Sequence, residues 1–372
     1  MRPLRVAIGV VAGTIGGPAT YGVQLVGALA ALNEPGFRLE VLTDRPGAFA
    51  ASDTLGVHRV ALPSPWAQPF WDNVAIPLAL RRLDVDLYHG TKHALPLPGV
   101  GRGRAAIVTI HDLAVLAEPE TFSRAQRLQL RLHLTHAARA ADHILCVSNH
   151  AAEDLQQRLG VAPQRISVVP NGVASQFRPP SPEERQAARA RLGIGPDEIL
   201  AAFVGTVQPR KRIEVAIAAV EILRGKGFKI RLAIAGRRRR GYAPAWLGEP
   251  PASVLLLGEL PDPALVELYG AADLMVSPST FEGFGLTFAE AMACGCPVVG
   301  VAVTSIPEVV GEGGLLVAGS EPGLVAAAME ELAADGSLRA ELARRALAQA
   351  ARLTWDRAAR LTLGAYRAGL NR

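Results

Sequence analysis

The chain has 372 residues, of which 49% are hydrophobic and 20% charged, so it is long enough for two globular domains with separate cores. Its net charge of +5 and isoelectric point near 9.4 suit an anionic substrate, an anionic membrane face or nucleic acid. The longest basic run, residues 237–240, has no interleaved aromatic residues of the kind that stack on bases. We therefore expect no nucleic-acid partner.

Apolar, β-forming runs alternate with amphipathic stretches from end to end, which is the pattern of parallel sheets joined by crossover helices. The pattern occurs twice. The first series predicts strands at residues 4–11, 38–43, 86–89, 105–110, 143–147 and 166–169. The second predicts strands at residues 199–205, 229–235, 253–257, 274–276, 297–303 and 315–317.

A proline-rich segment, residues 177–182, separates the two series and cannot continue either sheet. We place the boundary near residue 178 and expect domains at residues 1–177 and 178–353, followed by a last helix within residues 354–372. In open α/β sheets, ligands bind at the carboxyl ends of the strands. Functional residues are therefore expected just after the strands.

Two strand ends of the first domain carry candidate residues. Gly16 and Gly17 follow the first strand, but a phosphate-approaching loop and a tight structural turn look alike here. Their spacing does not match Gly-x-Gly-x-x-Gly, which disfavours a Rossmann dehydrogenase. His111 and Asp112 follow the strand at residues 105–110; by themselves they fit a buried structural pair as well as a functional one.

In the second domain, the strand ending near Val204 runs into Gly205 and then into Arg210 and Lys211, with a helix expected from about residue 212. Cations at the positive end of a helix dipole are unfavourable unless an anion is also bound. This placement predicts a diphosphate site, and the alternative is a pair of solvated basic side chains.

The most informative segment is residues 281–295, where a strand end, a glycine-rich turn and a helix follow one another. Glu282 lies on the loop, whereas Glu290 lies inside the helix. Gly283 and Gly285 let the backbone approach a ligand closely. The N–H groups expected to bind an anion or sugar oxygens are those of Phe284, Gly285 and Leu286. The alternative is an ordinary turn with two solvated carboxylates.

Together these motifs resemble the signatures of the retaining GT-B glycosyltransferases, specifically the group-one family that includes many bacterial mannosyl- and glucosyltransferases. The resemblance spans roughly residues 16–317, and its motifs occur in the expected order in both halves. It implies two Rossmann-like parallel-sheet domains facing each other across a central cleft. The N-terminal domain would take the acceptor and the C-terminal domain the nucleotide-sugar donor. The last helix would cross back to the N-terminal domain.

The resemblance also implies roles for single residues. Glu282 would face the donor sugar, His111 would contact the transferred sugar with Asp112 orienting its ring, and Arg210 and Lys211 would neutralise the leaving diphosphate. Glu290 would hold the ribose hydroxyls of the nucleotide. The complete donor-binding set is Gly16, Gly17, Gly205, Arg210, Lys211, Phe284, Gly285, Leu286 and Glu290. Thr206 stands where many members have an arginine.

The implied reaction moves a hexose, mannose or glucose, from a GDP- or UDP-linked donor to a glycan, lipid-linked or small-molecule acceptor with retention of configuration. Cationic side chains can replace a metal at the diphosphate, so we expect neither a metal nor a cofactor. Internal return and a transient Glu282 nucleophile both stay open as mechanisms. Rival functions are a nucleotide-sugar epimerase, a pyridoxal-phosphate sugar phosphorylase and a non-catalytic sugar-nucleotide-binding scaffold.

An aromatic, apolar and then basic segment in the first domain is a candidate for membrane contact. Trp66, Phe70 and Trp71 precede the apolar residues 75–80 and an Arg81-Arg82 pair. Such a segment suits a membrane-surface helix that finds a lipid-linked acceptor, and core packing is the alternative. Three cysteines suggest a reducing compartment, and no apolar run reaches about 18 residues. We expect a cytoplasmic protein, at most peripheral on the inner membrane face.

Overall fold

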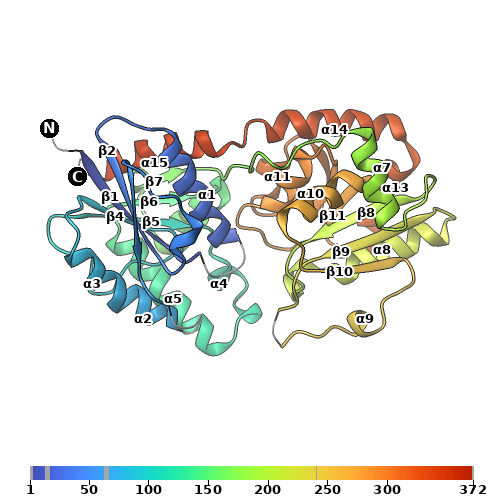
Figure 1. Ribbon diagram of the computed structural model, residues 1–372. Helices are drawn as coiled ribbons and strands as arrows, with labels where there is room; N and C mark the ends of the chain where they lie inside the picture. The colour runs from blue at the N-terminus through green and yellow to red at the C-terminus, as the bar shows by residue number, and fades with distance from the viewer. Residues whose placement is uncertain (1–2, 13–16, 63–66, 240, 371–372) are drawn as a thin grey trace. The chain divides into compact units, whose positions relative to one another are not determined.

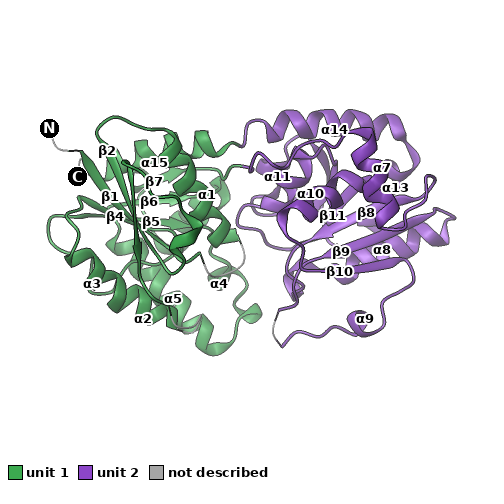
Figure 2. Cartoon of the chain, in the orientation of Figure 1, with its two compact units in different colours: residues 1–172, 354–372 green, residues 173–353 purple. Residues whose placement is uncertain are grey.

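The computed structural model describes residues 3–12, 17–62, 67–239 and 241–370. The chain divides into two compact units (Figure 2). Unit 1 comprises residues 1–172 and 354–372, and unit 2 comprises residues 173–353. Three residues named above, Gly16, Trp66 and Arg240, lie outside the described residues.

Unit 1 is built on a parallel sheet with the order β3-β2-β1-β4-β5-β6-β7. Its strands are β1 (Leu4–Val10), β2 (Phe37–Thr43), β3 (Leu55–Arg59), β4 (Leu87–Gly90), β5 (Ala105–Ile110), β6 (His143–Cys146) and β7 (Ile166–Val168). Its main helices are α1 (Gly17–Ala31), α2 (Gln68–Phe70), the π-helix η3 (Trp71–Ala75), α3 (Ile76–Arg81), α4 (Ala114–Ala117), α5 (Arg124–Ala140), α6 (Asn149–Leu159) and α15 (Trp355–Leu370). In Figure 1, α1 and α15 lie on one side of this sheet, and α2, α3 and α5 lie on the other.

Unit 2 has a second parallel sheet, with the order β10-β9-β8-β11-β12-β13. Its strands are β8 (Ile199–Val204), β9 (Ile230–Ala235), β10 (Val254–Gly258), β11 (Leu274–Ser277), β12 (Val298–Val301) and β13 (Gly314–Val317). Its helices are α7 (Pro182–Arg191), the 3₁₀ turn η6 (Pro209–Lys211), α8 (Ile213–Gly225), α9 (Ala245–Gly248), α10 (Asp262–Ala271), α11 (Leu286–Ala293), α12 (Ile306–Val310), α13 (Pro322–Ala334) and α14 (Gly336–Ala350).

Every strand predicted from the sequence is present, and the two parallel sheets confirm the predicted fold class. β3 was not predicted. Its sequence Leu-Gly-Val-His-Arg contains a glycine and only two strongly apolar residues, so its β propensity is weak. It forms through tertiary context, because β2 offers a free edge on which Leu55–Arg59 pairs in parallel register.

The division between the units falls after Gly172, whereas the proline-rich segment had suggested residue 178. The residues between these two points pack on unit 2. The Phe177 ring lies edge-on to Tyr269, with centroids 6.2 Å apart. The backbone N–H of Val173 donates to the Leu353 carbonyl. The last helix, α15, belongs to unit 1, where it contacts α1, β5 and β6.

A buried chain of hydrogen bonds ties α15 to the sheet of unit 1. Tyr366 Oη bonds to His89 Nδ1 at 2.8 Å, His89 Nε2 to Thr109 Oγ1 at 2.7 Å, and Thr109 Oγ1 to Tyr21 Oη at 2.8 Å. Burial, followed by the neighbouring His111, lowers the pKa of His89 to about 3, so its ring is neutral. This chain joins α15, β4, β5 and α1 without any buried charge.

Gly172 provides a test of how tightly the start of α15 is held. A Cβ atom on Gly172 would lie 2.2 Å from the backbone nitrogen of Trp355, and backbone atoms cannot rotate away as a side chain can. We expect Gly172→Ala to destabilise the protein by about 1–3 kcal/mol, as overpacking does, measured by urea or thermal unfolding.

The matched control is Gly364→Ala in α15, where an added Cβ meets nothing within 4 Å. Because alanine favours a helix interior over glycine, this variant should gain about 0.5–1 kcal/mol. Native stability of Gly172→Ala would contradict the close approach described here.

Candidate functional site

The carboxyl ends of β8 and β11 bring together the main candidate residues of unit 2. These two strands are hydrogen-bonded neighbours in parallel register, so the loops that follow them leave from the same edge of the sheet. One loop passes through Gly205 into η6, which carries Arg210 and Lys211. The other carries Glu282 into α11. Side chains 71 positions apart in the chain therefore meet.

A buried ion pair forms the centre of this site. Lys211 Nζ donates to Glu282 Oε1, and Arg210 Nη1 lies 3.7 Å from Glu282 Oε2. Lys211 is 7% exposed and Glu282 is 6% exposed. Burial raises the pKa of Glu282, but the Lys211 and Arg210 charges outweigh this effect and lower it overall. The carboxylate is therefore ionised, and the cluster of two cations and one anion keeps a positive excess.

Residues to which sequence reasoning gave no role hold Glu282 in position. Its backbone N–H donates to Thr304 Oγ1 at 3.1 Å, and Ser305 Oγ donates to its carbonyl oxygen at 3.0 Å. Ser279 hydrogen-bonds to its carboxylate. Thr304 has a left-handed backbone, with φ of 52°, which is costly for a β-branched residue. Thr304 and Ser305 lie 22 and 23 positions from Glu282 in the chain, so no local pattern links them to it, whereas Ser279 precedes it by only three residues.

The start of α11 has the geometry expected of a helix that binds an anion or sugar oxygens. Gly285 precedes the helix with φ of 95°, a conformation that favours glycine. Phe284 is buried, and its carbonyl accepts a hydrogen bond from Ser305 Oγ at 3.0 Å. Leu286 and Thr287 begin the first helical turn, where N–H groups lack an intrahelical acceptor, whereas the N–H of Phe288 donates to the Gly285 carbonyl at 3.0 Å.

Glu290 lies one turn further along α11 and is partly buried. Tyr269 Oη donates to its Oε2 at 3.3 Å. Burial raises the pKa of Glu290 to about 8, so in this environment the carboxyl group is mostly protonated near neutral pH. Unlike Glu282, it has no cation within ion-pair distance among the described residues. A protonated carboxyl both donates and accepts hydrogen bonds, which suits ligand hydroxyl groups.

In unit 1, His111 lies directly after β5 and is buried. Its Nε2 bonds to the Thr91 carbonyl at 2.8 Å, so Nε2 carries the proton and Nδ1 is the acceptor. Burial, and then the neighbouring His93, lower the pKa of His111 to about 3. The ring is therefore neutral, and the Thr91 carbonyl fixes its orientation. Asp112 Oδ1 accepts from the N–H of Ala114 at 2.9 Å.

The remaining candidates of unit 1 are more scattered. Gly17 is the first residue of α1 and is exposed. In the aromatic segment, Trp71 is 2% exposed and its indole N–H donates to the Val60 carbonyl at 3.0 Å, so it belongs to the core. Phe70, Val74 and Leu78 are exposed at four-residue spacing. No helix of the described residues is long and apolar enough to cross a membrane.

A double-mutant cycle tests the Lys211–Glu282 pair. Removing one member of a buried pair leaves an uncompensated charge, at a cost of about 3–5 kcal/mol. We expect Lys211→Met and Glu282→Gln each to destabilise strongly and the double variant to lose less than their sum, with a coupling above ~1 kcal/mol in urea unfolding.

The control cycle uses Arg360→Met and Asp356→Asn, an i,i+4 pair whose side chains are 67% and 61% exposed. Its coupling should be about 0.3–0.5 kcal/mol. Additive losses at Lys211 and Glu282 would show that the two side chains do not interact in solution.

Comparison with known proteins matches each half of the chain to a family of glycosyltransferases. Residues 184–349 match the family described as Glycosyl transferases group 1, and residues 15–177 match Glycosyltransferase Family 4. O-antigen chain mannosyltransferase B of Escherichia coli is 30% identical over 301 residues, covering 78% of this chain and 76% of the relative. D-inositol 3-phosphate glycosyltransferase of Acidothermus cellulolyticus is 39% identical over 247 residues, covering 62% of this chain but only 54% of the relative.

The fold also matches a solved structure along nearly its whole length. Anabaena HepE in complex with UDP-glucose aligns with a TM-score of 0.75 at 20% identity, covering 97% of this chain and 99% of HepE. The parallel sheets, the two family matches and the relatives agree with one another. The chain belongs to the group 1 glycosyltransferases of the GT-B fold, enzymes that transfer a sugar from a nucleotide-sugar donor.

Proposed function

We propose that this chain is a retaining hexosyltransferase that moves mannose or glucose from a GDP- or UDP-linked donor to a glycan, lipid-linked or small-molecule acceptor without a metal. The observation that carries the proposal is the Arg210–Lys211–Glu282 cluster beside the start of α11. It joins an excess of positive charge to a single ionised carboxylate. When a diphosphate leaves an anomeric carbon, the reaction needs positive charge near the diphosphate and negative charge near the sugar ring.

The cations act on the leaving group. As the bond from the anomeric carbon to the diphosphate oxygen breaks, negative charge grows on the diphosphate and positive charge on the sugar ring. Arg210, Lys211 and the first turn of α11 stabilise the diphosphate without reorganising, and each such fixed donor contributes about 3 kcal/mol. Because they supply this charge themselves, no metal ion is needed at the diphosphate.

Glu282 acts on the sugar. Its ionised carboxylate stabilises the positive charge that develops at the ring. Lys211 and Ser279 both hydrogen-bond to it, which weakens it as a nucleophile and favours internal return. In that route the acceptor oxygen bonds to the face that the diphosphate leaves, and the acceptor proton passes to a diphosphate oxygen.

The other roles follow from the same placement. Glu290, as a protonated carboxyl, holds the ribose hydroxyls of the donor, and Gly205 and Gly285 admit its phosphates. In unit 1, we assign Gly17 to the donor phosphates, and His111 accepts a hydroxyl of the transferred sugar at Nδ1. The mannosyltransferase relative and the UDP-glucose complex of HepE support a hexose donor.

A peripheral membrane contact fits the surface of α2 to α3. Phe70, Val74 and Leu78 recur every four residues and are 56%, 40% and 48% exposed, so they share one helical face. Arg81 and Arg82 follow at the end of α3 and are exposed. An apolar stripe beside cations suits the surface of an anionic bilayer, where a lipid-linked acceptor would be found.

Donor binding is the first test. UDP, GDP, ADP and TDP at ~100 times the dissociation constant should each add up to ~2.7 kcal/mol, seen as a rise of a few degrees in the melting temperature. We expect UDP or GDP to raise the melting temperature more than the other nucleotides do. We expect this rise to be smaller in Glu290→Gln. Glu312→Gln, at an exposed position, is the matched control. Absence of any shift would contradict a nucleotide-sugar donor and favour a scaffold.

The chemistry itself is tested with the donor that binds. The glycoside product should keep the anomeric configuration of the donor, read from its proton NMR spectrum, and activity should persist in excess chelator. Glu282→Gln should lower kcat by ~10²-fold or more, as loss of an electrostatic group does. An inverted product would exclude retention, and activity that is lost in chelator and restored by magnesium would exclude metal independence.

A further inference from the structure

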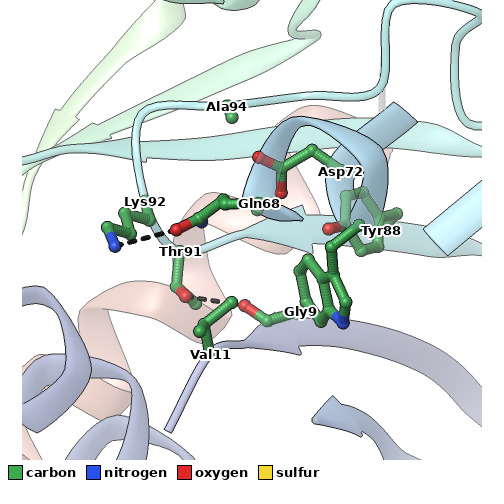
Figure 3. A pocket seen from close by; sticks show the side chains of 10 residues that line it. Gly9, Val11, Gln68, Asp72, Tyr88, Thr91, Lys92 and Ala94 are labelled. Atoms are coloured by element: carbon green, nitrogen blue, oxygen red, sulfur yellow. Dashed lines mark hydrogen bonds between the residues drawn. The ribbon is translucent and has the colours of Figure 1, made fainter. Parts of the chain in front are cut away.

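Unit 1 contains a cavity that the proposed roles do not use. It has a volume of about 250 Å³ and lies among α2, η3, the loop after β4 and the first half of α5. The surface that lines it is mostly apolar, but polar side chains also face it, namely Gln68, Asp72, Lys92, His93, Gln126, Gln129 and His133. Asp72 and Lys92 also line the smaller adjoining pocket drawn in Figure 3. The volume is below the roughly 300–1,000 Å³ typical of drug-sized ligands, so the cavity suits a single small ring.

Asp72 is an unusual residue for the interior of a protein. Its side chain lies in η3 and is only 9% exposed, and it makes no hydrogen bond to the residues that the structure describes. The nearby ammonium group of Lys92 instead donates to Gln68 Oε1 at 3.1 Å, as Figure 3 shows. Burial raises the pKa of Asp72 from 3.8 to about 7. A buried carboxyl without a hydrogen-bond partner is costly, and one that faces a cavity is placed to bind a ligand.

The cavity adjoins the histidine that we assign to the transferred sugar. His93 lines the cavity, and its ring lies edge-on to that of His111 with centroids 5.2 Å apart. The backbone of His93 is left-handed, with φ of 54°, and its N–H donates to the Thr109 carbonyl at 3.0 Å. Residues held in this region often mark functional sites. A ligand in the cavity would therefore lie next to the proposed sugar site of unit 1.

We propose that this cavity is the acceptor subsite and that it takes an uncharged, hydroxyl-rich ring, such as one sugar residue, whose hydroxyl groups donate to Asp72. The inference rests on the proposed function and names the acceptor class for it. Gln126 and Gln129 supply amide groups that both donate and accept, as sugar hydroxyls require. The single ammonium of Lys92 is offset by Asp72. A phosphate group would meet that carboxylate and lack the cluster of cations that phosphates need.

Saturation-transfer NMR on the full chain tests the site with methyl α-mannoside and methyl α-glucoside as probes, and with mannose 6-phosphate and inorganic phosphate as charged competitors. We expect a neutral glycoside to bind and the phosphorylated compounds not to displace it. Asp72→Asn should weaken binding by ~10-fold or more, the usual effect of losing a hydrogen bond to a charged group. Gln129→Leu, at an exposed position that folding tolerates, should also weaken it.

Gln156→Leu in α6 is the matched control and should bind as the native chain does. Failure of every neutral glycoside to bind, binding unaffected by both cavity variants, or preference for a phosphorylated probe would each overturn the inference. Stabilisation by donor nucleotides, measured in parallel, separates the two proposals. If nucleotides bind but glycosides do not, only this inference fails. If glycosides bind and no nucleotide does, the proposed function fails.

The pH dependence of the melting temperature distinguishes a ligand-binding role of Asp72 from a role in stabilising the fold. Between its ordinary pKa and about 7, the folded chain holds a proton on Asp72 that the unfolded chain has lost, so native stability falls as pH rises through this window. The groups around it that titrate or carry charge are Lys92, Tyr88, His93 and His133. An asparagine at position 72 does not titrate, so it does not lose stability as the pH rises. Asp72→Asn should therefore melt a few degrees above the native chain at about pH 8 and equal it at about pH 4. A lower melting temperature at both pH values would make Asp72 structural.

Discussion

The parallel pairing of every strand in both sheets is the constraint on which the rest of this structure depends. Parallel strands all end at one edge, so residues that follow different strands become neighbours there, whatever their separation in the chain. In unit 2 this constraint joins the loop after β8 to the loop after β11. In unit 1 it joins Thr91, after β4, to His111, after β5. Each unit thus brings candidate site residues together at this edge of its sheet.

The buried carboxyl groups of the two units differ in a way that fits different tasks. Glu282 is paired with Lys211 and stays ionised. Glu290 and Asp72 lie apart from any cation that bonds to them among the described residues, and burial raises the pKa of each. A paired carboxylate offers a fixed charge, which suits a developing cation. A carboxyl that titrates near neutrality offers hydrogen bonds in either direction, which suits neutral hydroxyl groups. The physical cause is the same desolvation in all three cases, and the neighbouring cations decide its outcome.

These groups also carry a cost that the rest of the fold must offset. A buried ion pair gains little net stability over an apolar pair, and a buried carboxyl with a raised pKa lowers stability above its ordinary pKa. Buried charge also occurs outside the proposed sites, since Glu40 is 1% exposed and pairs with Arg5, Arg38 and His58. The polar link between α15 and the sheet of unit 1 uses neutral Tyr366, His89, Thr109 and Tyr21. Buried charge is therefore not confined to the proposed sites, although the link between α15 and the sheet does without it.

Much of the fold was predictable from the sequence, because hydrophobic runs and turn residues are local signals. They located twelve strands, the fold class, and Arg210, Lys211, Glu282 and His111 at strand ends. The weakly apolar β3 was not predicted, because it forms a strand only by pairing with the edge of β2. Periodicity does not encode strand order, so the Lys211–Glu282 pair, the support from Thr304, and the cavity beside Asp72 could not be foreseen. The sequence by itself determined which segments are strands and which residues follow them. Only the tertiary structure decided which of those residues meet and which carboxyl groups stay charged, because both depend on neighbours that are remote in the chain.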